Sequence, residues 1–168
     1  MKAILYTSNS GFTAEYADML GKAIGLPVYS LAECSQQVEK GAKIIYLGWL
    51  MAGTVNGYKK AASKYCIQAV CAVGMGAAGS QLEQTRKANQ LPEKTPLFVL
   101  QGGFDMNRLH GIYKFMMQFM KRTVGKTVTE KKEKTPEEID MLDLLENGGS
   151  RVSQEQLVPV INWYREQK

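Results

Sequence analysis

Histidine and cysteine are scarce in this chain of 168 residues, which has one histidine and three cysteines. Cys34, Cys66 and Cys71 form no Cys-x-x-Cys pair, so neither a disulfide framework nor a zinc site is expected. We expect three buried free thiols. Nucleophilic catalysis that needs a histidine would depend on His110 alone, and this residue is expected on the polar face of a helix.

Long apolar runs are also missing, and no segment approaches the roughly 20 apolar residues of a membrane span. Met1 and Lys2 lead directly into a short strand pattern without the features of a secretory signal, so a cytoplasmic protein is expected. Hydrophobic residues make up 45% and charged residues 22%, as in an ordinary globular domain. The net charge of +5 favours anionic ligands or an anionic membrane face, and does not by itself indicate nucleic acid.

Short apolar segments alternate with helical patterns over the first hundred residues. Strands are predicted at 3–6, 28–31, 43–48, 67–73 and 96–101. Helical patterns cover 12–24, 56–64 and 80–90, with a short helix or turn at 32–40. This alternation predicts one α/β domain over 1–168, with a doubly wound, five-stranded parallel sheet in the order 2-1-3-4-5.

The pattern changes after the fifth strand, where a helical insert and loop are expected over 102–135. Residues 106–122 form an amphipathic helical pattern with an apolar arc of roughly 200°, wider than one packing face requires. The excess apolar width fits a core helix buried from two sides, a dimer, a partner or a membrane surface. Thr135, followed by Pro136 and Glu138, predicts a helix start, and Asn147 with two glycines predicts its end. A second capping box at 153–156 is expected to open the final helix.

A loop rich in hydroxyl groups follows the first predicted strand and precedes the first predicted helix. In α/β sheets this position binds ligands, and a phosphate there needs backbone N–H groups, a helix N-terminus and hydroxyl donors. The loop has no Lys or Arg, and the chain has no Gly-x-x-x-x-Gly-Lys-Ser/Thr pattern, so a monophosphate suits it better than a triphosphate. The alternative is a plain turn with a helix cap. The loop residues are Ser8, Asn9, Ser10, Gly11, Phe12 and Thr13.

This loop resembles the FMN-phosphate motif of flavodoxins, Ser/Thr-x-Ser/Thr-Gly-x-Thr, which directly follows their first strand. The resemblance implies a flavodoxin-like fold with non-covalently bound FMN, whose ring lies between the loops after the third and fourth strands. Those loops carry the other cofactor-binding residues that the resemblance implies: Trp49, Leu50, Met51, Ala52 and Gly53, then Gly74, Met75, Gly76 and Ala77.

Both later loops have alternative interpretations. Trp49 could stack on the flavin or be an ordinary core residue. The segment 74–79 reads Gly-x-Gly-x-x-Gly, which taken alone suggests a dinucleotide site. However, that fingerprint normally follows the first strand, and the next strand here ends without an acidic residue. We interpret these glycines as allowing close approach of the backbone to the flavin.

The segment 102–121 is similar to the insert of the flavodoxin-like protoporphyrinogen dehydrogenase family, through Gly102-Gly103-Phe104 and the Tyr, Lys, Phe and Met residues of 113–121. The two resemblances imply an FMN-binding electron-transfer protein or an FMN-dependent oxidoreductase of that type. The third alternative is a non-enzymatic binding module whose flavin site is inactive. The expected partners are a redox protein, a quinone or a small-molecule substrate, with membrane or dimer contact through 106–122.

Overall fold

The computed structural model describes residues 1–109, 115 and 135–167. Its central sheet contains five parallel strands: β1 (Ala3–Thr7), β2 (Val28–Ser30), β3 (Lys43–Met51), β5 (Cys66–Gly74) and β6 (Leu97–Gln101). They are ordered β2-β1-β3-β5-β6, and the short β4 (Thr54–Val55) pairs antiparallel with β3. The expectation of an α/β domain with a mostly parallel sheet is therefore confirmed.

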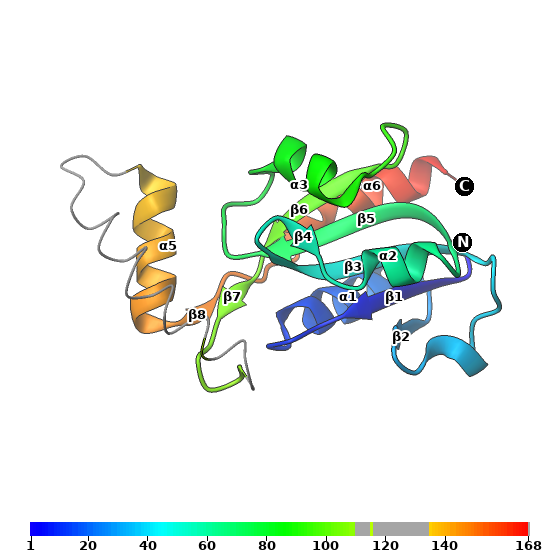
Figure 1. Cartoon of the computed structure of the whole chain (residues 1–168), viewed down its shortest axis with the longest axis horizontal. Helices are drawn as coiled ribbons and strands as arrows, with labels where there is room; N and C mark the ends of the chain where they lie inside the picture. Colours follow the sequence, from blue (N-terminus) through cyan, green and yellow to red (C-terminus); the bar gives the residue numbers. More distant parts are fainter. Residues whose placement is uncertain (110–114, 116–134, 168) are drawn as a thin grey trace.

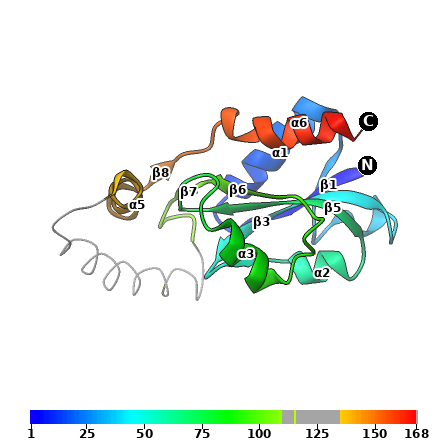
Figure 2. The same cartoon turned by 90° about the horizontal axis from the view of Figure 1, so that it is seen from above.

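Helices cover both faces of this sheet. Figure 2 shows α1 (Phe12–Ile24) and α6 (Val158–Glu166) on one face, and α2 (Tyr58–Ala62) and α3 (Leu82–Asn89) on the other. Two separate apolar clusters fill the layers: Tyr16 and Leu20 of α1 lie in the first, and Tyr46, Tyr58 and Ala61 lie in the second. Because alternate strand residues face opposite layers, strands covered on both sides are apolar throughout, as the sequence pattern indicated.

The helix predicted for 12–24 is confirmed to the residue, since its buried stripe and the left-handed Gly25 at its end both agree with the pattern. Two helical predictions were too long: residues 56–64 and 80–90 contain the shorter α2 and α3. The short helix or turn expected at 32–40 is confirmed as the 3₁₀ helix η1 (Cys34–Gln36) with turn residues beside it. Helix ends are set by tertiary contacts and caps that the apolar spacing does not record.

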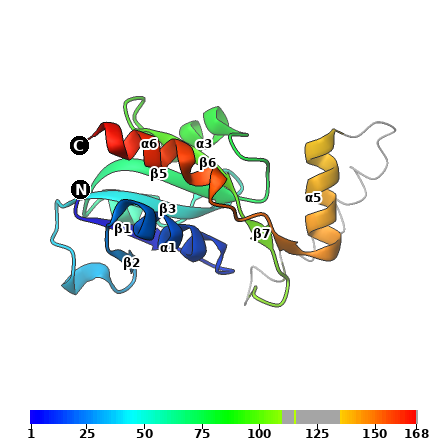
Figure 3. The same ribbon diagram turned by 180° about the vertical axis from the view of Figure 1, so that it is seen from behind.

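A long insertion, called the excursion from here on, separates β6 from α6 and spans residues 103–150. Its base is a ribbon of β7 (Gly103–Phe104) and β8 (Gly149–Ser150), and α5 (Pro136–Asn147) lies at the end of the molecule opposite the two termini (Figures 1 and 3). The pairing of β7 with β8 places the excursion at 103–150, further along the chain than the insert expected at 102–135. Residues 106–108 form a turn, so the prediction of a helix that begins at residue 106 is wrong. The rest of that predicted helix cannot be compared in full, because the described residues do not include 110–114, which contain His110, or 116–134.

The two capping predictions had opposite outcomes. Thr135 caps α5 in a full capping box with Glu138, and Gly148 ends the helix, as expected. The prediction of a second capping box at 153–156 is wrong. The 3₁₀ helix η2 (Glu155–Leu157) forms there and leads into α6, and no described side chain caps the N-terminus of either helix. The reason is that the Gln156 amide is bonded to Gln101 and Arg151, while the backbone N–H of Ser153 donates to the Tyr16 hydroxyl (3.4 Å).

Candidate functional site

The three loops singled out in the sequence meet at one edge of the sheet, because β1, β3 and β5 are adjacent and parallel. Thr7 pairs with Gly48, and Gly48 pairs in turn with Ala72, so the three strands end side by side. β1 also has β2 on its other side, so the chain changes direction across the sheet between β1 and β3. A crevice at such a switch point, outside the carboxyl ends of the strands, is the usual ligand site of open α/β sheets.

The first loop, 8–13, joins β1 to the N-terminus of α1. Gly11 is the N-cap residue and has a φ of +96°, a conformation that side chains other than glycine rarely adopt. Its N–H donates to Ser8 Oγ (3.1 Å), and among the described residues no side chain caps α1. The first-turn N–H groups of a helix have no acceptor within the helix, so this N-terminus can receive an anion. Thr13 is buried at 2% exposure, whereas Ser8, Asn9 and Ser10 are half-buried.

Arg108, from the excursion, lies against this loop. Its Nη1 is 3.5 Å from the Ser10 carbonyl oxygen, and its guanidinium carbon lies 5.7 Å from the centre of the Phe12 ring. A Cβ placed on Gly11 would be 3.4 Å from the same Nη1. The sequence pattern gave no reason to pair residue 108 with residues 10–12, which are nearly a hundred positions earlier. Arg108 is therefore a charged residue that lies against this loop from another part of the chain, and sequence reasoning missed it.

The second predicted loop is mostly strand, which corrects the expectation. β3 continues through Trp49 and Leu50 to Met51 and then folds back as β4. The turn consists of Ala52 and Gly53, with φ of +48° and +78°. Two positive φ values in a two-residue hairpin turn match type I′, whose twist suits the flanking strands. Trp49 is half-buried, so it is not a fully buried core residue.

The hairpin is fastened to α3 by Asn89, a residue that the sequence analysis did not single out. Its side chain is 3% exposed, accepts from the Val55 N–H (2.8 Å) and donates to the Gly53 carbonyl (2.9 Å) and the Thr85 carbonyl (2.7 Å). A single amide therefore holds both the turn and the returning strand. The Ala52–Gly53 turn is thus fixed on one side, and its tip at Ala52 is exposed.

Hydrogen bonds also fix the chain just after the hairpin. Both the Tyr46 hydroxyl (2.6 Å) and Thr7 Oγ1 (2.7 Å) donate to the Asn56 carbonyl, and the Asn56 N–H donates to the Trp49 carbonyl (2.9 Å). Burial raises the pKa of Tyr46 to about 12, so its hydroxyl stays a donor at physiological pH. The ends of β1 and β3 are consequently tied together beneath the site.

The third loop begins at Gly74, and its glycines are not the start of a helix. α3 begins only at Leu82, after Gln81 in the left-handed conformation, so Gly74, Gly76 and Gly79 all precede it. A dinucleotide fingerprint needs its glycines to lead directly into the helix N-terminus that holds the pyrophosphate. The geometry therefore disfavours the dinucleotide alternative. Within this segment the Ser80 hydroxyl is buried and has no hydrogen-bond partner among the described residues.

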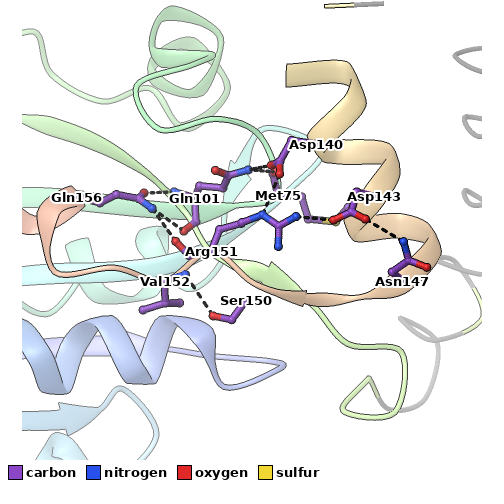
Figure 4. A network of polar contacts seen from close by, with 9 residues as sticks. All are labelled: Met75, Gln101, Asp140, Asp143, Asn147, Ser150, Arg151, Val152 and Gln156. Atoms are coloured by element: carbon purple, nitrogen blue, oxygen red, sulfur yellow. Dashed lines mark hydrogen bonds and ion pairs between the residues drawn. The ribbon is translucent and has the colours of Figure 1, made fainter. Parts of the chain in front are cut away.

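A polar network joins the third loop to the excursion (Figure 4). Gln101, at the end of β6, donates to the Met75 carbonyl (3.3 Å) and to Asp140 of α5 (2.5 Å). Arg151 then binds Asp140 (2.8 Å) and Asp143 (2.6 Å). The bond from Asn147 and the Arg151 contact lower the pKa of Asp143, and the two carboxylates raise that of Arg151. α5 is thus attached to the residue that follows Gly74.

An apolar cluster lies beside the same loop. Phe104, Leu109 and Leu144 are buried together, and Met75 and Met106 pack against them. Gly103 passes so close to the loop after β1 that a Cβ there would lie 2.7 Å from the Phe12 ring. The excursion therefore contacts the candidate site at Phe12 and at Met75.

The cysteines lie away from these contacts. All three are free; Cys34 and Cys71 are buried as expected, and burial raises the pKa of Cys71 to about 12. Cys66 is exposed at the start of β5, at the opposite edge of the sheet, so the expectation of burial was wrong for this residue. Cys66 begins an apolar strand, but the fully buried part of β5 extends only from Ala69 to Val73.

Comparison with family models, curated proteins and solved structures finds no match for this chain. The structure offers no three grouped His, Cys, Asp or Glu side chains suited to a metal ion over residues 1–109 and 135–167. In the same part of the chain, no helix has the length and hydropathy to cross a bilayer. The interpretation of the site therefore rests on its own geometry.

Proposed function

We propose that this chain is a flavodoxin-like protein that binds FMN non-covalently and transfers electrons. The observation that carries the proposal concerns three segments at one switch point. They are the N-terminus of α1, which no described side chain caps, the hairpin after β3 and the glycine-rich loop after β5. Leaving out the short β4, the strand order is 2-1-3-4-5, and in flavodoxin itself that order places FMN between the first and third strands.

The residues present fit the parts of FMN. Backbone N–H groups at the start of α1 and the hydroxyls of Ser8, Ser10 and Thr13 would hold the phosphate. The loop contains no acidic side chain that would repel it. The flat ring would lie between the half-buried Trp49 on the hairpin and the backbone of the loop that begins at Gly74. FMN supplies the redox chemistry when bound, by taking up and releasing electrons.

The test is the visible absorbance spectrum of the purified full-length chain before and after addition of FMN and desalting. We expect flavin bands that remain with the protein. The double variant Ser10→Ala with Thr13→Ala should lose them, whereas the control Ser35→Ala with Ser63→Ala, at exposed hydroxyls outside the three loops, should not. A folded wild-type protein that retains no FMN and does not quench its fluorescence would refute the proposal and leave the binding module with an inactive flavin site.

A second candidate function is favoured by the apolar cluster beside Met75. A simple electron carrier needs only an exposed ring edge, but here Phe104, Leu109 and Leu144 border the same loop. This arrangement suits an FMN-dependent oxidoreductase of the protoporphyrinogen dehydrogenase type, in which the excursion contributes to an apolar substrate site. Turnover of protoporphyrinogen with a menaquinone analogue would support this candidate, and absence of turnover by the FMN-loaded chain would leave electron transfer to a protein partner.

The expected partner depends on whether the chain is an electron carrier or an oxidoreductase. A redox protein would be the partner of a carrier, and a quinone or another small apolar molecule would be the partner of an oxidoreductase. The net charge of +5 favours partners with an acidic surface or an anionic membrane face. Contact with a membrane or with a second copy through 106–122 stays a prediction, because most of that segment lies outside the described residues.

A further inference from the structure

The loop after β1 lacks a fixed positive charge of its own, although its proposed ligand is strongly anionic. None of residues 8–13 is Lys or Arg. A phosphate monoester carries a charge of about −2 near neutral pH. Hydroxyls and the partial charge of a helix N-terminus neutralise only part of this charge. A cation brought to the loop by another part of the chain would complete the site.

Arg108 is placed to supply that charge. Its guanidinium is within 3.5 Å of the Ser10 carbonyl and lies over the Phe12 ring, so it borders the loop at the start of α1. The side chain is 58% exposed and its contact with Ser10 is long. Within the part of the chain that the structure describes, several of its five N–H donors are therefore available to an incoming oxyanion. Arg presents these donors as a planar fork that matches phosphate oxygens.

Two nearby carboxylates, those of Asp105 and Glu15, weaken the attraction between Arg108 and a bound phosphate. Asp105 pairs with Arg108 at 3.2 Å and belongs to the same turn, so a bound phosphate would share the guanidinium with it. Glu15 lies in the first turn of α1 and is exposed. Because both acids are at least partly solvated, water and salt screen them, and they weaken the attraction of Arg108 without cancelling it.

We propose that Arg108 is a binding residue for the phosphate of the cofactor, so that the excursion completes the phosphate site of the central domain. This inference rests on the proposed function. It goes beyond that function because it assigns a charged ligand from outside the loop. It also means that phosphate binding and the seating of residues 103–109 on the loop stabilise one another.

The experiment compares FMN with riboflavin, which has the same ring but no phosphate, by flavin fluorescence titration at 50 mM and 300 mM salt. The variants are Arg108→Gln, Arg108→Lys and the control Arg165→Gln, which removes an exposed charge at the end of α6. We expect Arg108→Gln to weaken FMN about tenfold and to leave riboflavin unchanged, with Arg108→Lys intermediate and the control like wild type. The variant should also show a flatter salt dependence for FMN.

Each other outcome overturns the inference in a distinguishable way. If Arg108→Gln binds FMN like wild type, while the Ser10 and Thr13 double variant does not, the loop alone holds the phosphate and Arg108 has no part in it. If FMN and riboflavin weaken equally, Arg108 only shapes the loop. If wild type binds neither flavin, the proposed function itself has failed. Circular dichroism of each variant shows that it is folded.

Discussion

Replacing Asn89 tests how the hairpin after β3 is held. In Asn89→Ala, the N–H of Val55, a residue that is 2% exposed, loses its acceptor, and the carbonyls of Gly53 and Thr85 lose a donor. The buried Val55 N–H left without an acceptor costs about 1–3 kcal/mol, and each of the two lost bonds to carbonyls adds about 0.5 kcal/mol. Asn89→Ala should therefore lower the free energy of unfolding by about 2–4 kcal/mol. For a chain of this size that is a decrease in melting temperature of roughly 5–15 °C.

Asn89→Asp separates hydrogen bonding from packing, because it keeps the shape of the side chain. One carboxylate oxygen can still accept from Val55, but the other faces two carbonyl oxygens, so burial and repulsion should raise the folded-state pKa of the new carboxyl above its usual value near 3.9. The folded state then binds more protons than the unfolded state. Its stability is therefore greatest below the unfolded pKa and falls as pH rises through the folded pKa.

Thermal melts of wild type and both variants at pH 4 and pH 7 provide the assay, and hydrogen exchange at Val55 reports on the hairpin directly. The deficit of Asn89→Asp relative to wild type should be larger at pH 7 than at pH 4, whereas that of Asn89→Ala should not depend on pH. Lys87→Ala, at an exposed position on the same helix, is the control. The reasoning is refuted if Asn89→Ala melts within 2 °C of wild type, or if Asn89→Asp matches wild type at pH 7.

Two further predictions concern the junction of the excursion with the sheet. Tyr16→Phe removes a 2.7 Å bond to the Gln101 carbonyl and should cost about 1 kcal/mol in chemical denaturation. Since burial raises the pKa of Tyr16 to about 12, its stabilisation is intact below pH 10 and is lost as pH rises towards 12, and absorbance at 295 nm should show this late titration. The pKa of the Asp143 carboxyl is lowered in the folded protein, so its contribution to the stability of α5 should be present above pH 4 and be lost as pH falls through the folded pKa. Arg151→Gln removes the ion pair with Asp143 and should speed hydrogen exchange in α5 at pH 7 without changing exchange in β3. Equal exchange in wild type and that variant would contradict the role of the network.

The local pattern of the sequence predicted much of the framework. The stripe of Tyr16, Leu20 and Ile24 with Gly25 behind it specified α1, and Thr135 with Glu138 specified the start of α5, because each signal lies within a few residues of its effect. Residues 153–156 carry the same kind of signal, yet they form no capping box. There the glutamine that should reach back along the chain is bonded to Gln101, more than fifty residues earlier.

The sequence by itself determined the alternation of strands and helices, the parallel sheet that this alternation requires, and the hydroxyl-rich loop at the start of α1. These features depend on periodicity and on residue types that act on their neighbours. Only the tertiary structure decided that β3 continues into a hairpin held by Asn89, that the excursion is closed by β7 and β8, and that Arg108 lies on the loop. Each of these contacts joins residues far apart along the chain. A hydrogen bond or ion pair of this kind leaves no periodic trace in the sequence, because it depends on which segments the packed core brings together.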